Sequence, residues 1–453
     1  MMRKLILNLK PANFLIAALF IVSLALLFRG ISMPKSGLGW RSTIILISAI
    51  STVFTACLFY VKEEIKFGVL LVFFSSGLSL FLFNFALEIR PEPYIKNIAP
   101  PPDKAELILN MRNIENITAY PRISPLVYRE YYENKLATPV PFLPLSAISN
   151  SVILNGPLEN PETPGWMIIK SDRYGFNNPD HVYEKPGNKI LIVGDSFAAG
   201  VPVPEGKDVA GVLRTRGHNA ISLGYSGNGP LSELATVLEY GPYLKPDIIF
   251  WFWFDGNDVG DLILESQNPI LLKYLKGDEF SQNLIQRQKE INEMGKKISE
   301  YELNKYLANK KSYKEINSPH KGSWKFGDLI VSKHNLITLY HIRNLMGFSA
   351  DTLAMKNFQP ILEKAKKTSN NLGAELYFVY IPTIPYIERG APAPTYKEVL
   401  SGLQKLNIEV LDLYSIFNSM NNPLDLYDGH LNEEGYEFLA NLLEKQFIHQ
   451  PPH

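Results

Sequence analysis

The chain has 453 residues, and its 45 Lys and Arg balance 45 Asp and Glu, so the formal net charge is zero. A protein that neutralises several nucleic-acid phosphates carries a basic excess, so this balance excludes electrostatic nucleic-acid binding. The one cysteine, Cys57, excludes an intrachain disulfide and a thiolate metal cluster. Hydrophobic residues make up 46% of the chain and charged residues 20%, which is typical of a globular protein.

Three apolar runs without a charged residue occupy the N-terminal part: Ala12 to Phe28, Ser42 to Val61 and Phe67 to Leu87. Each is long enough to cross a hydrocarbon core of ~30 Å as a helix. We therefore predict a region of three transmembrane helices over residues 1–88. A signal peptide is the alternative for the first run, and a soluble apolar core is the alternative for all three.

The next segment is rich in proline. Between Glu88 and Asn188 lie 15 of the 32 prolines of the chain. Proline resists both helix interiors and central strands. We predict that residues 89–165 form a stiff, mostly irregular connector.

Residues 166–453 alternate short apolar runs with helical stretches, which is typical of a parallel sheet covered by helices. In such folds the functional site gathers at the carboxyl ends of the strands. An insertion at about residues 262–350 carries a polar helix, which is either a solvated face or a lid or partner surface. The predicted strands are Lys189 to Val193, Asn219 to Leu223, Asp247 to Phe254, Ala374 to Ile381 and Ile408 to Leu411.

Four segments at the ends of these elements carry candidate chemistry. Ser196 follows the first strand where a helix is expected to start, so its hydroxyl lies near free N–H groups that stabilise an oxyanion. Gly227 follows the second strand, and Asn257 follows the third. Near the C-terminus His430 follows two acids, Asp425 and Asp428. Taken singly, these residues are equally typical of a helix cap or a plain turn.

Taken together, the four segments fall at one sheet edge in chain order. The sequence here resembles the SGNH, or GDSL-type, hydrolase family over roughly residues 170–448. The matching blocks are Gly194-Asp195-Ser196, the Gly227 loop, Gly256-Asn257-Asp258, and Asp428 with His430.

The resemblance implies an α/β fold, a flavodoxin-like three-layer α/β/α domain, and acyl-ester chemistry without a metal or other cofactor. Ser196 is then the nucleophile, His430 its general base and Asp428 the acid that orients the imidazole. The oxyanion hole consists of the Ser196 N–H, the Gly227 N–H and the Asn257 Nδ2.

The sequence departs from the family at the acid. The family usually spaces acid and histidine as D-x-x-H, but position 427 is Tyr. The Asp428-x-His430 spacing resembles that of some polysaccharide O-acetyltransferase relatives. We favour Asp428 over Asp425, because Gly429 allows the bend that brings residues two apart to one side.

These expectations combine into a membrane-anchored serine esterase that removes acyl groups from an envelope glycan or lipid. An O-acyltransferase acting on a cell-envelope polysaccharide and a non-catalytic membrane scaffold are the alternatives. The expected partners are an acylated small-molecule, glycan or lipid substrate and the membrane, with no nucleic acid. By analogy with tethered members of the family, we expect a cytoplasmic N-terminus and a catalytic domain on the periplasmic side, since charge counting distinguishes the orientations poorly.

Overall fold

The computed structural model describes residues 11–32, 40–91, 103–124, 127–128, 130–136, 138–157, 165–277, 280–308, 323–326, 329–332 and 350–448. The chain divides into two compact units. Unit 1 comprises Met1–Glu92 with Pro319–Leu353, and unit 2 comprises Pro93–Ser318 with Ala354–His453.

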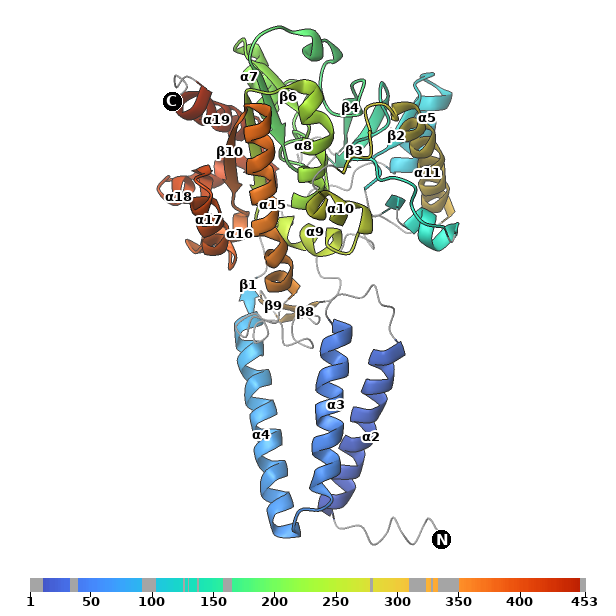
Figure 1. Ribbon diagram of the computed structural model, residues 1–453, viewed down its shortest axis with the longest axis vertical. Coiled ribbons are helices and arrows are strands. Elements are labelled where there is room, and N and C mark those ends of the chain that lie inside the picture. The colour runs from blue at the N-terminus through green and yellow to red at the C-terminus, as the bar shows by residue number, and fades with distance from the viewer. Residues whose placement is uncertain are drawn as a thin grey trace. The chain divides into compact units, whose positions relative to one another are not determined.

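Unit 1 contains the helices α2 (Pro11–Ser32), α3 (Trp40–Leu58) and α4 (Glu63–Glu88), which coincide with the three apolar runs (Figure 1). Within the described ranges, two helices are long and apolar enough to cross a membrane, with spans Ala12–Arg29 and Glu63–Leu87. In α3 only the shorter stretch Ser48–Leu58 is comparably apolar. Two of the three predicted spans are therefore found among the described residues, and the third, over α3, stays a prediction.

Polar contacts join the helices of unit 1. The hydroxyls of Ser23 and Ser51 lie 2.7 Å apart between α2 and α3. The Asn13 amide of α2 donates to Glu63 of α4 at 3.1 Å and accepts from Lys66 Nζ at 2.8 Å. Such pairs satisfy polar groups that would otherwise be left without partners among apolar side chains.

Unit 1 also contains a small sheet in the order β1-β9-β8, formed by β1 (Arg90–Pro91), β8 (Ser323–Phe326) and β9 (Leu329–Ser332). The strand β1 follows α4 directly and pairs antiparallel with β9. The predicted insertion at 262–350 is therefore divided between the two units, because this pairing associates its later part with the N-terminal helices.

Unit 2 is built on a five-stranded parallel sheet in the order β11-β10-β7-β5-β6. Its strands are β5 (Lys189–Val193), β6 (Asn219–Ser222), β7 (Ile248–Phe254), β10 (Glu375–Ile381) and β11 (Glu409–Asp412). Each overlaps one of the predicted strands, so the prediction of an α/β domain with a parallel sheet is confirmed. Numbered in chain order, the strands follow 2-1-3-4-5, the flavodoxin-like arrangement.

Helices cover both faces of this sheet, which gives three layers (Figure 1). The strand β7 illustrates the cause, because its successive side chains point to opposite faces. Trp251 and Trp253 pack in the core with α8 (Pro230–Leu244) and α15 (Ala350–Leu372). Phe250 and Phe252 pack in the second core with α7 (Val209–Thr215) and α19 (Glu433–Leu443). Burial on both faces explains why these strands read as continuous apolar runs.

The first part of the insertion packs into unit 2 as α9 (Asp258–Glu265), α10 (Pro269–Lys276) and α11 (Gln288–Ala308). The helix α11 corresponds to the predicted polar helix, but it buries Ile291 and Ile298 in the core. Its charged residues therefore mark only one side of a packed helix.

The proline-rich segment is not mostly irregular where it is described. It contains α5 (Lys104–Asn113), β2 (Ala119–Pro121) and β3 (Val152–Pro157), and β4 (Trp166–Lys170) completes an accessory sheet in the order β2-β3-β4. Pro121 lies on the edge strand β2, and Pro157 lies at an irregularity in the β3–β4 register, two places where a missing N–H is tolerated. The segment is therefore a folded part of unit 2.

The remaining elements of unit 2 are short. They are η1 (Glu130–Lys135), η2 (Asp180–Glu184), α16 (Ile384–Arg389), α17 (Tyr396–Lys405), α18 (Leu413–Asn418), η3 (Pro423–Leu426), β12 (Tyr427–Asp428), β13 (His430–Leu431) and η4 (Glu444–Ile448).

Candidate active site

The strand order reverses at β5, whose neighbours β6 and β7 extend the sheet in opposite directions. In doubly wound sheets a crevice opens at the carboxyl ends of the strands where the order reverses. Ser196 follows β5, Gly227 follows β6 and Asn257 follows β7. Three of the predicted site residues therefore start from the expected edge of the sheet.

Ser196 lies in a tight turn and not at the start of a regular helix. The Ala199 N–H donates to the Asp195 carbonyl at 3.0 Å, and the Val201 N–H donates to the Ser196 carbonyl at 3.0 Å. The next helix, α7, begins only at Val209. The expected helix N-terminus at Ser196 is wrong, because Pro202 and Pro204 lack the N–H groups that would continue a helix.

The Ser196 hydroxyl contacts His430. Its Oγ lies 2.9 Å from His430 Nε2, and it also lies within donating distance of Asp195 Oδ2, at 3.2 Å. The imidazole packs against Phe197, with ring centroids 4.8 Å apart, and against Phe254 at 6.5 Å. These aromatic contacts hold the ring, so two residues far apart in sequence form a serine–histidine pair.

The acid candidates differ in their relation to His430. Asp428 and His430 are directly paired across the β12–β13 ladder, with Gly429 between them at a φ of 84°. Paired residues of such a ladder direct their side chains to the same face. Asp425 lies in η3 with an exposed side chain, and its carbonyl accepts from Asn432 Nδ2 at 2.8 Å. The backbone thus pairs His430 with Asp428 and not with Asp425.

Two of the predicted oxyanion donors are free in the described part of the chain. Neither the Ser196 N–H nor the Gly227 N–H donates to any described group. The Gly227 loop is held at both ends, since the Tyr225 N–H donates to the Gly194 carbonyl at 3.1 Å and the Gly229 N–H to Glu265 Oε1 at 2.8 Å. Gly227 itself is exposed and has a φ of 84°, a conformation that favours glycine.

The third predicted donor, the Asn257 amide, is already engaged. Its Nδ2 donates to Asp195 Oδ2 at 3.1 Å and to Asp261 Oδ2 at 3.0 Å. An amide nitrogen carries two protons, so both have carboxylate acceptors. Stabilisation of an oxyanion by Asn257 therefore requires one of these two bonds to break.

The carboxylates of this region have raised pKa values. Burial raises the pKa of Asp261 to about 7, and the nearby Glu265 and Asp195 raise it further while Arg122 lowers it. Burial likewise raises the pKa of Glu265 to about 7. For Asp258, burial and then the neighbouring Glu233 and Asp195 hold the pKa well above its usual range. Asp258 therefore favours its protonated form near neutral pH, and Asp261 and Glu265 are partly protonated there, which limits repulsion around the site.

Sequence reasoning missed the two carboxylates that contact the Gly227 and Asn257 segments. Asp261 and Glu265 lie four residues apart on α9, directly after Asn257, so their i,i+4 spacing was an available signal. It missed Arg122 as well, whose Nη1 donates to the Ser226 carbonyl. Arg122 follows β2 in the proline-rich segment, where no motif marked it.

The sequence matches no protein-family model, and it matches no curated protein. Among solved structures, the chain is similar to the crystal structure of the lipase/acylhydrolase from Enterococcus faecalis, at 15% sequence identity and a TM-score of 0.31. The match covers 59% of this chain and 100% of that one. Within the described ranges, no group of three or more His, Cys, Asp or Glu side chains could hold a metal ion.

Proposed function

We propose that this protein is a membrane-anchored serine ester hydrolase of the SGNH type that removes acyl groups from an envelope glycan or lipid. The observation that carries the proposal is the distance of 2.9 Å between Ser196 Oγ and His430 Nε2, at the sheet edge where the Ser196 and Gly227 N–H groups are free. A nucleophile, a base and two oxyanion donors are the minimum set for acyl transfer.

The reaction follows from this arrangement. Ser196 Oγ attacks the ester carbonyl carbon while His430 Nε2 takes the hydroxyl proton, and Asp428 orients the imidazole and stabilises its cation. The carbonyl electron pair moves to oxygen, where the free N–H groups stabilise the charge. The imidazolium then protonates the departing alkoxide and leaves an acyl-enzyme. Water, deprotonated by His430, attacks that ester and releases the carboxylic acid and Ser196.

A second candidate is an O-acyltransferase, in which a sugar hydroxyl replaces water in the second step. The observation that favours it is the Asp428-x-His430 spacing, which resembles that of some polysaccharide O-acetyltransferases. Product analysis separates the two, because a transferase forms acylated sugar when an acceptor glycan is added. A hydrolase forms free carboxylic acid at an unchanged rate.

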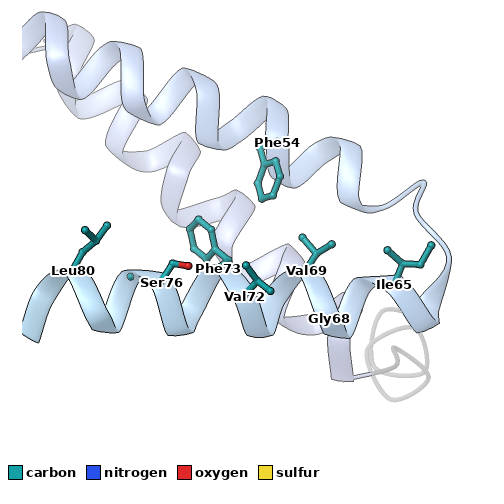
Figure 2. Close-up of a pocket in the computed structure, with 9 residues that line it drawn as sticks. Phe54, Ile65, Gly68, Val69, Val72, Phe73, Ser76 and Leu80 are labelled. Atoms are coloured by element: carbon teal, nitrogen blue, oxygen red, sulfur yellow. The ribbon is translucent and has the colours of Figure 1, made fainter. Parts of the chain in front are cut away.

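The membrane anchor is supported by the surface of unit 1. The large apolar side chains of α4 are mostly exposed, including Phe67 at 69% and Val72 at 64%. The helices α3 and α4 also border an apolar groove, where the rings of Phe54 and Phe73 stack with centroids 6.1 Å apart (Figure 2). A water-exposed protein rarely presents apolar surface on this scale, whereas lipid chains would cover it.

We place the N-terminus in the cytoplasm and unit 2 on the periplasmic side, which requires α3 to cross the membrane as well as α2 and α4. A reporter fused after His453 tests this topology. Activity of a periplasm-dependent reporter supports it, and activity of a cytoplasm-dependent reporter overturns it.

The catalytic proposal is tested on the full-length protein in detergent, with p-nitrophenyl esters of increasing acyl length and a fluorophosphonate probe. Ser196→Ala should lose the label and lower kcat by ~10³ or more. The matched control is Ser419→Ala, which changes an exposed serine after α18 and should leave both readouts unchanged. Labelling that persists in Ser196→Ala would overturn the proposal.

A further inference from the structure

Arg122 links the accessory sheet to the predicted oxyanion loop. It directly follows β2, and its backbone N–H donates to the Leu154 carbonyl of β3 at 2.9 Å. Its guanidinium Nη1 donates to the Ser226 carbonyl, a contact between residues 104 positions apart in the chain. The accessory sheet thus places the positively charged guanidinium of Arg122 beside the loop that follows β6.

The accepting carbonyl belongs to the peptide unit that carries the Gly227 N–H. In a trans peptide the carbonyl and the N–H point in opposite directions. A donor fixed on the Ser226 oxygen therefore sets the direction of the Gly227 N–H, which points away from the guanidinium. A charged donor on the carbonyl also polarises the peptide and makes its N–H a stronger donor.

The loop is held to the same segment at a second point. Tyr225 Oη donates to the Ile123 carbonyl at 2.6 Å, so the residues after β2 contact both sides of Ser226. The guanidinium also lies against the glycine itself, since a Cβ placed on Gly227 would be 3.4 Å from Arg122 Nη1. The loop is thereby tied to the residues after β2 at Tyr225 and at Ser226.

The charge of Arg122 is not neutralised locally. Among the described side chains it forms no ion pair, although it is close enough to Asp261 to lower the pKa of that carboxyl. The guanidinium is therefore a positive charge placed beside the loop. Its field favours negative charge developing beside the Gly227 N–H.

We propose that Arg122 is a positioning residue of the oxyanion hole, which orients and polarises the Ser226–Gly227 peptide so that the Gly227 N–H receives the oxyanion. This proposal rests on the serine-hydrolase function proposed above. Under this proposal the accessory sheet, which is formed largely from the proline-rich segment, contributes to catalysis by positioning Arg122. The guanidinium acts through the peptide and does not contact the reacting atoms.

The test compares Arg122→Ala, Arg122→Lys and Arg112→Ala in the full-length protein in detergent, with p-nitrophenyl acetate as substrate. Arg112 is the matched control, because its Nε donates to the Ala119 carbonyl of β2 at 2.9 Å, and its guanidinium contacts Glu300 and the Tyr120 ring and, among the described residues, no part of the loop. Loss of a whole oxyanion donor costs about 10² to 10³ in kcat, so misorienting one should cost about 10- to 100-fold. We expect this loss in Arg122→Ala with KM changed by less than about twofold, partial recovery in Arg122→Lys, and rescue by added guanidinium ion.

The outcomes separate this inference from the proposed function. Turnover that survives in Ser196→Ala overturns the proposed function and this inference with it. If Ser196→Ala is inactive but Arg122→Ala keeps the kcat of the unaltered protein, only the role of Arg122 is overturned. An Arg122→Ala variant that loses kcat, shows no rescue by guanidinium and melts at a lower temperature than Arg112→Ala also overturns it, because the residue is then merely structural.

Discussion

Replacing Asp428 by asparagine tests which acid serves His430. The change keeps the shape of the side chain but removes the charge of the residue that is paired with His430 in the β12–β13 ladder. A carboxylate accepts the Nδ1 proton and so leaves Nε2 free to accept from Ser196 Oγ, 2.9 Å away. An amide can donate to Nδ1 and favour the opposite tautomer, which in a buried serine triad costs about 10⁴ in kcat.

The expected loss is smaller here because the pair is partly solvated. Both Asp428 and His430 are half-buried, so water also stabilises the imidazolium and screens the carboxylate. We therefore expect kcat to fall by about 10² to 10³, with the melting temperature within a few degrees of the unaltered protein.

The assay is p-nitrophenyl acetate hydrolysis from pH 6 to 9, with Asp425→Asn as the control. Asp425 is also an aspartate within five residues of His430, but its side chain is exposed and its backbone lies outside the ladder. Asp425→Asn should change kcat by less than about tenfold. If Asp425→Asn is the more damaging change, the assignment of Asp428 is refuted.

Three further changes test other parts of the site. Asn257→Ala should lower kcat for p-nitrophenyl acetate by about 10² to 10³ if its amide turns to the oxyanion, and a loss below about threefold would exclude that role. Gly224→Ala should destabilise unit 2 by about 3 kcal/mol in a denaturant titration, because its Cβ would lie 2.3 Å from the Ala199 nitrogen, whereas Gly260→Ala has open space and should not. Burial raises the pKa of Asp255 from 3.8 to about 7, so the folded state retains a proton that the unfolded state loses in this interval. The stabilisation of the folded state by the protonated Asp255 is present at low pH and is lost as pH rises through about 7. Asp255→Asn should therefore flatten the decline in melting temperature between pH 5 and pH 8. An unchanged slope would contradict this.

The sequence alone was sufficient for the sheet and for the edge that carries the site. Buried parallel strands read as short apolar runs, so all five strands of the sheet were predictable from local composition. Because such strands point the same way, residues that follow β5, β6 and β7 must meet at one edge. This reasoning located the three segments, and the resemblance to the SGNH family pointed to Ser196, Gly227 and Asn257 within them.

Only the tertiary structure decided what surrounds those residues. The proline-rich segment forms strands because Pro121 lies on an edge strand and Pro157 at a register irregularity, which composition does not reveal. The engagement of the Asn257 amide by two carboxylates and the contact of Arg122 with Ser226 join elements distant in the chain. Periodicity reports the environment of a residue within one helix or strand, whereas such contacts depend on how separate elements pack. The local pattern therefore determined where the site lies. Packing determined which side chains hold the Asn257 amide and the Ser226 carbonyl, and which charges lie beside them.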